Sequence, residues 1–461
     1  MRFNNIFTRR QARTLGLFAL VAALAPIASF AEPAEVESWN AKFQSTYVWQ
    51  GKRPFEAAYS GANSLTKDAE SSYSFTATAA LGFRPWTGGE FYFNPEAAQG
   101  IPLSGLTGLG GFTNGEIART AGPTLTFYSA RMFVRHTWDM GGEQEVVESG
   151  MNQLAGKVDK RRWVLTAGNL SVMDIFDANA YSHDPRTQFL NWSLMTHGAY
   201  DFAADARGYS WGAALEWYSD EWVVRAGRFI QPKEPNQQQL DPDILRHYGD
   251  QVEVERAHVI GEQPGKLRLL AFRNLTRMSR FQDATNAVAQ TGGAPDINTV
   301  RTGDQVKYGF GLNLEQAVSA DFGVFARASW ADGGTETYAF TEIDRSVSGG
   351  VLVKGSGWGR SQDTFGFAIA RNGLSSAHQD YLSAGGLGFF VGDGRLNYRP
   401  ELIVETLQRQ PRKSCLDLHR LAIYPKPCVQ HRPWPSEYRC CAAAHRVLSL
   451  THEEYCPTTH H

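Results

Sequence analysis

Cysteine is scarce in this chain and is confined to one end of it. All five cysteines lie in the last 47 residues, at Cys415, Cys428, Cys440, Cys441 and Cys456. Their spacing matches no standard zinc pattern such as paired C-x2-C motifs. The cysteine-free body cannot be held together by disulfides. It is compatible with an exported β-barrel, which closes through backbone hydrogen bonds alone.

Long hydrophobic runs are also missing. Apart from one N-terminal segment, no apolar stretch approaches the roughly 18–20 residues that a membrane helix needs. The chain of 461 residues has 45 glycines, 12% aromatic residues and a mean hydropathy of −0.35. This composition fits soluble domains, and it fits a transmembrane barrel equally well, because barrel strands alternate faces and never produce a long apolar run.

An excess of basic charge is absent from the body. The formal net charge is −2, but residues 1–31 and residues 406–461 each carry +4, which leaves −10 on residues 32–405. An acidic body makes nucleic acid an unfavourable partner. If the body encloses a channel, this charge modestly favours cations over anions.

The N-terminus has the pattern of a secretory signal peptide. A basic region with Arg2, Arg9, Arg10 and Arg13 precedes an apolar stretch from Leu15 to Ala28, and Ser29-Phe30-Ala31 follows with small residues at the two positions that a signal peptidase reads. We predict cleavage after Ala31. The alternative is a membrane anchor, which is disfavoured because the stretch is short and contains Pro26.

The body alternates apolar and polar residues with a period of two, the pattern of β-strands. The clearest segments span residues 39–50, 72–84, 128–138, 209–217, 306–315 and 364–369. The two longest contain 12 and 13 residues, near the length that crosses a bilayer at a tilt, and aromatic residues often lie near the ends of the segments. A soluble sandwich or propeller would also alternate, but no repeat at a propeller period is present.

Turn signals separate these segments. Short turns are predicted at Ser219–Glu221 and Gly261–Gly265, and a tight hairpin at Gly392–Gly394. Long loops are predicted at Gly100–Gly122 and Pro232–Ile244. Short turns alternating with long loops are typical of outer-membrane barrels. The predicted fold is therefore an all-β, transmembrane, antiparallel β-barrel.

Several motifs fit enzyme or ligand patterns poorly. Gly208–Gly212 matches G-x-S-x-G, but Ser210 lies within an alternating segment and not at a strand-to-helix elbow, so we interpret it as a polar lumen residue. Asp174, Asp177 and Asn179 lack the spacing of a calcium loop, and a well-capped loop is favoured. Gly105–Gly115 is interpreted as a flexible loop, and His136 and His183 are isolated. No catalytic residue, metal ligand or cofactor site is predicted.

The polar faces of the strands supply the candidate site. In a soluble sandwich they would be solvated, whereas in a barrel they project into the lumen, where opposed charges filter solutes. Sugars would need acids, amides and arginines for their hydroxyls, and aromatic rings to stack upon. The predicted pore-lining residues are Arg131, Arg135, Gln251, Glu253, Glu255, Lys307 and Arg327.

Residues from about Tyr47 to Thr406, over three quarters of the chain, resemble the carbohydrate-selective porin family (OprB type). The resemblance rests on the run Trp49 to Phe55, the run from Glu90 through Asn94-Pro95-Glu96, and the stretch from Ala167-Gly168-Asn169 through Asp174–Asn179 to Asn191-Trp192. It implies an outer-membrane barrel of about 16 strands that passes sugars by facilitated diffusion without a cofactor. Some similar porins are associated with the uptake of divalent metals, notably manganese, and the acidic body of this chain keeps that alternative open.

The last 56 residues depart from the resemblance. Such porins end in a strand that closes on an aromatic residue, whereas this chain ends Pro457-Thr458-Thr459-His460-His461. Alternation stops near Thr406, and bases encoding Gln430–Pro435 can be read one position later as a sequence that resembles the family's terminal hairpin. We hypothesise a frameshift near codon 406, and we expect the last one or two strands to be disrupted.

The sequence thus predicts a signal peptide at residues 1–31, a porin barrel at 32–405 and an atypical tail at 406–461. The predicted function is passive, selective diffusion of small solutes, above all carbohydrates, across the Gram-negative outer membrane. Alternatives are a porin for divalent cations, and a structural or enzymatic barrel. Expected partners are sugars, outer-membrane lipid and the barrel assembly machinery, with a monomer or homotrimer as the assembled form.

Overall fold

The fold is seen in a computed structural model, which describes residues 36–57, 60–117, 122–412, 415–425 and 440–453. Side chains are described for residues 36–57, 60–108, 111–117 and 122–410. The predicted signal peptide therefore lies outside the described residues, as do the side chains of the tail.

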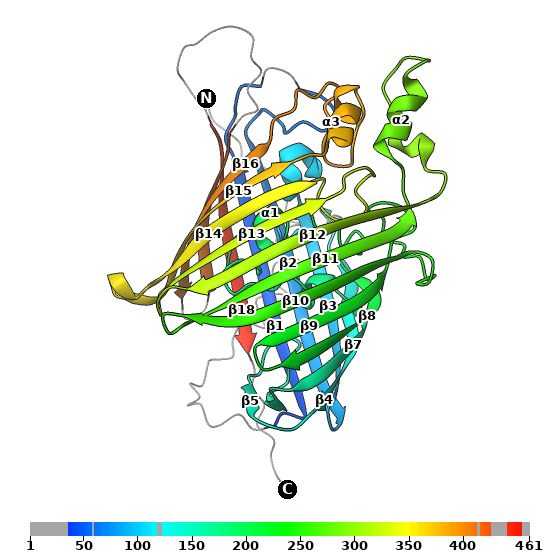
Figure 1. Cartoon of the computed structure of the whole chain (residues 1–461). Coiled ribbons are helices and arrows are strands. Elements are labelled where there is room, and N and C mark those ends of the chain that lie inside the picture. Colours follow the sequence, from blue (N-terminus) through cyan, green and yellow to red (C-terminus); the bar gives the residue numbers. More distant parts are fainter. Residues whose placement is uncertain (1–35, 58–59, 118–121, 413–414, 426–439, 454–461) are drawn as a thin grey trace. The chain divides into compact units, whose positions relative to one another are not determined.

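Fourteen strands with described side chains form one continuous antiparallel sheet (Figure 1). They are β1 (Trp39–Lys52), β2 (Glu70–Trp86), β3 (Gly89–Ile101), β4 (Thr126–Asp139), β7 (Arg162–Leu170), β8 (Ser210–Ser219), β9 (Trp222–Ile230), β10 (Tyr248–Ile260), β11 (Gln263–Arg277), β12 (Asp304–Ala317), β13 (Phe322–Ala331), β14 (Arg345–Gly355), β15 (Arg360–Gly373) and β16 (Glu401–Arg412). Each pairs with its neighbours in the chain, except that β4 pairs with β7. The predicted all-β antiparallel barrel fold is confirmed.

The tail adds two strands at the level of the backbone. β17 (Cys415–Pro425) pairs with β16, and β18 (Cys440–Glu453) pairs with both β17 and β1, so the strand order returns to its start. This pairing differs from the expected loss of the last strands. It has a simple physical reason, because ladder hydrogen bonds use backbone N–H and C=O groups that every residue except proline carries. The fit of the tail's side chains to lipid and lumen stays a prediction.

Short and long connections occupy opposite ends of the barrel. Turns of two to four residues join β2 to β3, β8 to β9, β10 to β11 and β12 to β13. A separate hairpin, β5 (Gln144–Val147) and β6 (Gly156–Asp159), lies between β4 and β7, and η7 (Ser356–Trp358) lies between β14 and β15. The predicted turns at Asp220 and Gly261 and both predicted long loops lie where expected.

The predicted tight hairpin at Gly392–Gly394 is wrong. These residues lie in the long connection between β15 and β16, after α3 (Ser376–Ser383). The apolar residues just before this turn fold into the barrel instead of forming a strand. Phe390 is fully buried there, and its ring packs edge-on against that of Phe112, with ring centres 4.6 Å apart. Gly-Asp-Gly marks a turn but does not show that strands flank it.

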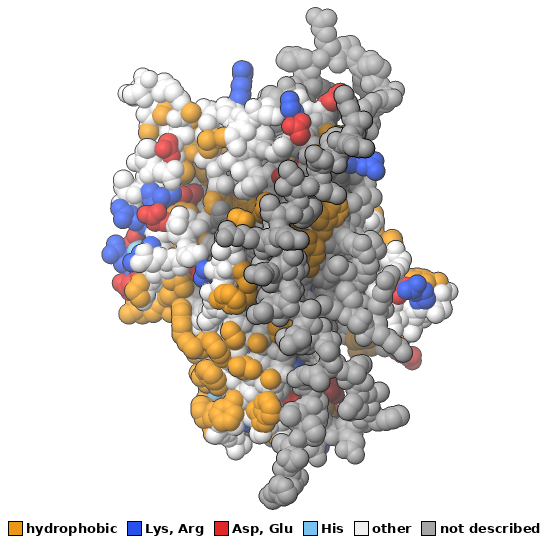
Figure 2. Space-filling view, turned by 180° about the vertical axis from the view of Figure 1, so that it is seen from behind, with side chains coloured by type: hydrophobic (Ala, Val, Ile, Leu, Met, Phe, Trp, Pro, Cys, Tyr) orange, Lys and Arg blue, Asp and Glu red, His pale blue; other side chains and the backbone are white. Residues whose placement is uncertain are grey.

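Apolar side chains cover the outside of the barrel. On β1 the odd-numbered aromatic residues are exposed and most of the even-numbered polar residues are buried, as in a barrel with a water-filled interior. At the short-turn end Trp39, Trp86, Trp138, Trp163 and Trp222 are 37–51% exposed, and at the other end Trp49, Phe127, Trp211 and Tyr308 are exposed. Trp39 and Trp49 lie ten residues apart on β1, and at about 3.3 Å per residue and a tilt of roughly 45° this gives an apolar band about 23–25 Å tall. Figure 2 shows hydrophobic side chains gathered on one face below a zone of charged ones.

Long loops fold into the barrel and fill much of it. The longest, residues 171–209, is called here the interior loop and carries η5 (Val172–Asp174) and α1 (Trp192–Met195). The connection after β3 carries η3 (Leu103–Leu106) and η4 (Gly108–Phe112), and that after β11 carries α2 (Phe281–Val288) and η6 (Ile297–Val300). Phe112, Trp192, Phe202, Phe340 and Phe390 form an aromatic core between these loops and the wall. Among the described residues no helix is long and apolar enough to span a membrane.

Candidate functional site

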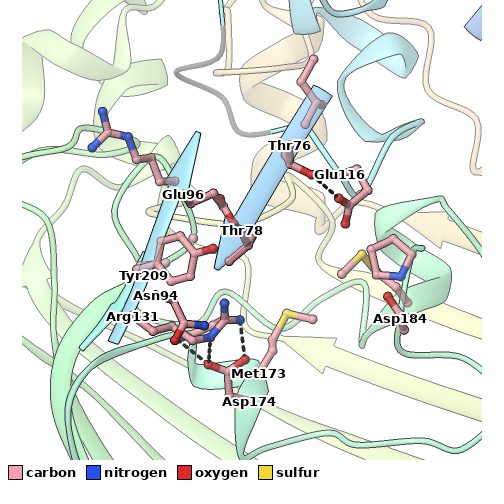
Figure 3. Close-up of a pocket in the computed structure, with 18 of the residues that line it drawn as sticks. Thr76, Thr78, Asn94, Glu96, Glu116, Arg131, Met173, Asp174, Asp184 and Tyr209 are labelled. Atoms are coloured by element: carbon pink, nitrogen blue, oxygen red, sulfur yellow. Dashed lines mark hydrogen bonds and ion pairs between the residues drawn. The ribbon is translucent and has the colours of Figure 1, made fainter. Parts of the chain in front are cut away.

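A cavity of about 560 Å³ lies inside the barrel, between the wall and the inward loops (Figure 3). Its wall comes from β2, β3 and β4, which contribute Thr76, Thr78, Asn94, Glu96, Tyr128 and Arg131. The interior loop, the loop after β3 and the loop after β13 supply the opposite side. Gln44 of β1 and Met151 and Asn152, between β5 and β6, also line it, so segments of four strands and four loops converge on one polar space.

Arg131 is held on the cavity wall by a bidentate ion pair. Its Nε and Nη2 atoms donate to Asp174 Oδ2 and Oδ1, both at 2.7 Å. Asp174 also accepts from the backbone N–H of Ser171 at 3.0 Å, which fixes the first turn of η5. The guanidinium carbon lies 5.2 Å from the centre of the Tyr209 ring. A planar group fixed in this way presents hydrogen-bond donors and a stacking face in a set orientation.

A second charged pair, Glu116 and Arg186, faces the same cavity. Glu116 Oε1 lies 3.2 Å from Arg186 Nε, and the other carboxylate oxygen accepts from Thr76 at 3.1 Å. Burial raises the pKa of Glu116 to about 7, against the opposing effect of Arg186. Figure 3 shows Glu116 and Asp184 apart from the Arg131–Asp174 pair. The cavity therefore has charges of both signs, and one of them titrates near neutral pH.

Aromatic faces complete the lining. Trp192 and Phe340 stack in parallel with ring centres 5.2 Å apart, and Phe202 packs against Phe340 at 4.8 Å. Tyr128 donates its hydroxyl to Glu96, and Arg207 lies over the Tyr128 ring at 4.3 Å. Such faces suit the C–H surfaces of a sugar ring, while the neighbouring acids and arginines suit its hydroxyls.

Four cavity residues have buried side-chain atoms without a hydrogen-bond partner among the described residues: Asn152, His183 and Arg186 have one such atom each, and Asn94 has two. Asn94 is fully buried, and neither its Oδ1 nor its Nδ2 atom has a hydrogen-bond partner within the described residues. It lies opposite Arg131 at a register shift between Asn94 and Pro95, where the partner strand β4 has one extra residue, Ala130. A buried amide without a partner costs free energy unless a solute or water satisfies it. Sequence reasoning missed this role, although a proline within an alternating strand is a signal for a bulge.

The seven predicted pore-lining residues all face the barrel interior or its inward loops, and one of them borders the cavity. That residue is Arg131. Arg135 lies nearer the short-turn end, where its Nη1 donates to the carbonyl of Asn152 at 3.1 Å. Gln251 is buried and donates weakly to backbone carbonyls of β9 and β10. Their role in conduction stays a prediction.

The other four hold buried ion pairs. Arg225 bridges Glu253 and Glu255 at 2.9 and 3.0 Å, and Glu255 also accepts from Arg268 at 2.8 Å. Lys307 Nζ lies 3.1 Å from Asp201 Oδ2. Arg327 Nε donates to Asp177 Oδ1 at 3.0 Å. Two of these pairs tie the wall to the interior loop, so they position the loop that shapes the cavity.

Wall carboxylates also accept backbone N–H groups of the interior loop. Glu405 accepts from Leu190 and Asn191 at 2.7 and 3.1 Å, Glu315 accepts from Ala180 at 2.7 Å, and Glu253 accepts from Asp177 at 2.8 Å. An irregular loop buried in a barrel must find partners for its backbone, and a charged acceptor makes the strongest ones. Much of the acidic lumen charge is thus used to hold the loop.

The remaining motifs have structural explanations. Ser210 begins β8, where its hydroxyl donates to the carbonyl of Ile230 at 2.6 Å. Asp177 and Asn179 are buried and bonded within the interior loop and to Asn313. Within the described residues, no group of three or more His, Cys, Asp or Glu side chains could hold a metal ion.

The comparisons with known proteins agree with this geometry. The family model "Carbohydrate-selective porin, OprB family" matches residues 63–408, three quarters of the chain. The chain belongs to the OprB family. It is therefore an outer-membrane porin, a channel and not an enzyme. A search of curated proteins by sequence found no match.

One solved porin structure shows the same fold as this OprB-family chain, and two others are matched at lower TM-scores. The high-pH structure of Pseudomonas putida OprB has 13% identity and a TM-score of 0.66, with 90% of this chain and 94% of that chain covered. The low-pH structure of the same protein has 11% identity and a TM-score of 0.48, with 90% and 93% covered. Pseudomonas aeruginosa OccK2 (OpdF) has 10% identity and a TM-score of 0.42, with 90% and 98% covered.

Proposed function

We propose that this porin lets small carbohydrates diffuse passively and selectively through the cavity. The observation that carries the proposal is that the charged lining groups are paired with one another, whereas a neutral amide in the lining is unpaired. Arg131 and Asp174 form a bidentate ion pair, and Glu116 lies within ion-pair distance of Arg186, whereas neither amide atom of Asn94 has a hydrogen-bond partner among the described residues. An amide that can donate and accept suits the hydroxyls of a neutral solute, and aromatic faces suit its ring.

The divalent-cation alternative has less support from the geometry. It rested on the acidic body, and Glu253, Glu315 and Glu405 each accept hydrogen bonds from the interior loop. A cation would have to compete with these contacts. The family alone supports passage of small solutes such as sugars, and the choice of carbohydrate needs a transport measurement.

Swelling of liposomes that contain the purified porin tests the proposal. We expect faster swelling in isotonic hexose or disaccharide than in a divalent chloride of matched osmolarity. Asn94→Ala should lower the sugar rate several-fold and leave potassium chloride conductance within about twofold, because the amide is neutral. Asn286→Ala, on exposed α2, is the matched control. Faster swelling in the divalent salt would favour the cation porin, and no swelling from folded protein would refute both.

The domain boundaries are also proposals. Residues 1–31 would be removed on export, residues 32–405 would form the porin body, and residues 406–461 would be read in a shifted frame. The family match ends at residue 408, close to the proposed shift. Resequencing the gene decides the matter, since an in-frame reading through all five cysteine codons would end the frameshift hypothesis. Monomer or trimer, and recognition by the assembly machinery, are to be measured on the purified barrel.

A further inference from the structure

The outer face of the barrel has a group of arginines above the apolar band, at the long-loop end of β9, β10 and β11. We name it the outer arginine cluster, and its members are Arg228, Arg246, Arg273, Arg277, Asp250 and Asp304. The strand register places Asp250 between Arg228 and Arg273, and Arg277 beside Asp304. Residues directly opposite in a sheet share a face, so these side chains form one patch.

The carboxylates of the cluster are already engaged. Asp250 accepts from Arg228 at 2.7 and 2.8 Å, with both of its oxygens used. Asp304 accepts from Arg246 at 3.2 Å and lies 3.1 Å from His247, whose other ring nitrogen lies 2.6 Å from Asp241. Each acid therefore has its own cation or imidazole, and none is left for the arginines of β11.

Arg273 and Arg277 remain without a partner. Both are exposed, and no hydrogen bond or ion pair joins either guanidinium to another residue in the part of the chain that the structure describes. They lie four residues apart with Leu275 between them, so all three point to the same side of β11. The cluster as a whole has four arginines against two aspartates, a surplus of positive charge.

The position of the cluster relates it to the membrane. Leu269 on β11, Val252 on β10 and Tyr308 on β12 lie on the same outer face and are 55%, 47% and 45% exposed. Arg273 comes four residues after Leu269, toward the long loops. In outer-membrane barrels the long loops face outward, so this height is the headgroup level of the outer leaflet.

We propose that the outer arginine cluster binds the phosphorylated headgroup of an outer-leaflet glycolipid, with Arg273 and Arg277 as the primary phosphate contacts. Guanidinium groups form paired hydrogen bonds with phosphate oxygens, and the acyl chains of the same lipid would lie on the apolar band below. The attachment would be at the wall of the barrel, separate from the solute cavity, and would fix how the porin sits among its lipids.

Native mass spectrometry of the folded full-length protein with lipid A tests this inference. Arg273→Gln/Arg277→Gln should weaken binding at least tenfold. Arg256→Gln is the matched control, because Arg256 is an exposed arginine of β10 near the short-turn end, stacked over Trp222 at 5.2 Å, and its loss should change binding less than twofold. Heat-modifiable gel mobility and unchanged conductance verify the fold. If the double variant does not fold, Arg273→Lys/Arg277→Lys should give an intermediate affinity, because lysine keeps charge but not the paired geometry.

Three further outcomes would overturn the proposal. Equal binding by wild type and the glutamine double variant would show that the arginines do not contribute. Equal binding of dephosphorylated lipid A would show that the apolar band alone holds the lipid. Complete displacement of lipid A by millimolar inorganic phosphate would show a site for free phosphate. Stronger binding of lipid A than of phosphatidylethanolamine, weakened by salt, is the supporting result.

Discussion

Replacing Asp177 with asparagine should loosen the interior loop from the barrel wall. Asp177 is fully buried, and its carboxylate accepts from Arg327 Nε at 3.0 Å, from the backbone N–H of His197 at 2.8 Å and from the Thr196 hydroxyl at 2.7 Å. Burial lowers the pKa of His197 to about 4, so its imidazole is neutral at pH 7 and Arg327 is the countercharge. Asp177→Asn therefore leaves a buried guanidinium without its anion.

The size of the effect follows from that unpaired charge. Removing one partner of a buried ion pair costs about 3–5 kcal/mol. We expect about 3 kcal/mol, because an asparagine amide still accepts one hydrogen bond. Each 1.4 kcal/mol is a tenfold change, so local opening of the loop should become roughly a hundredfold more frequent. By contrast, Asp174→Asn breaks the partly exposed pair with Arg131, which is worth at most about 1 kcal/mol, or about fivefold.

Hydrogen exchange in detergent micelles measures this opening at the amide of His197. We expect a rate roughly a hundredfold faster in Asp177→Asn, less than fivefold faster in Asp174→Asn, and partly restored in Asp177→Asn/Arg327→Gln, where the buried charge is gone. Equal exchange in wild type and Asp177→Asn would refute the reasoning.

The difference in His197 amide exchange between wild type and Asp177→Asn should depend on pH. Burial alone would raise the pKa of Asp177, but Arg327 and His197 hold it well below its ordinary value of 3.8. A carboxyl with a depressed folded-state pKa contributes stability above its unfolded pKa, and that contribution is lost as the pH falls toward the folded pKa. The exchange rates of wild type and Asp177→Asn should therefore show their full difference at pH 5–8, and this difference should shrink progressively below about pH 4.

Three other perturbations follow from single contacts. Glu116→Gln should abolish a rise in potassium-over-chloride selectivity between pH 6 and pH 8, measured by reversal potential, because the wild-type carboxyl with a pKa of about 7 gains its negative charge in this interval. Glu405→Gln should cost about 1.5–3 kcal/mol of loop stability, read as faster exchange at Leu190 and Asn191, because it weakens two charge-assisted hydrogen bonds. Gly311→Ala should destabilise by about 1–3 kcal/mol in urea unfolding, because its Cβ would lie 2.4 Å from His197 Nε2, whereas Gly357→Ala in open space should be near neutral.

Strand alternation predicted the fold because it depends on one local property, the face on which a side chain lies. Residues 39–50 show this, since the expected inner and outer faces of β1 agree with its burial pattern. The same property predicts that both Arg131 and Lys307 face the lumen. Alternation cannot show that Asp201 of a distant loop covers Lys307 while Arg131 stays on the cavity wall.

Contacts of the interior loop are beyond any local pattern. Asp177 and Arg327 are 150 residues apart, and Glu405 reaches Leu190 across 215 residues. No sequence motif predicts a contact between residues so far apart in the chain. The run of residues around Asn94 resembles the porin family in sequence, but the unpartnered amide of Asn94 follows only from the placement of β3, β4 and the interior loop together.

Net charge is a poor guide to selectivity in such a barrel, and this bears on the choice between sugars and cations. A formal charge of −10 on residues 32–405 would by itself favour cations. Yet the wall acids Glu253, Glu315 and Glu405 bind backbone N–H groups of the loop, and Asp177 and Asp201 pair with buried cations. Glu253 and Glu315 also pair with Arg225 and Arg268, so four of these five negative charges are offset by a neighbouring cation. A solute in the cavity would meet paired charges, an unpaired amide and aromatic faces. We therefore expect only weak cation preference below pH 6, rising as Glu116 ionises, and a preference for neutral hydroxylated solutes that does not follow the overall charge.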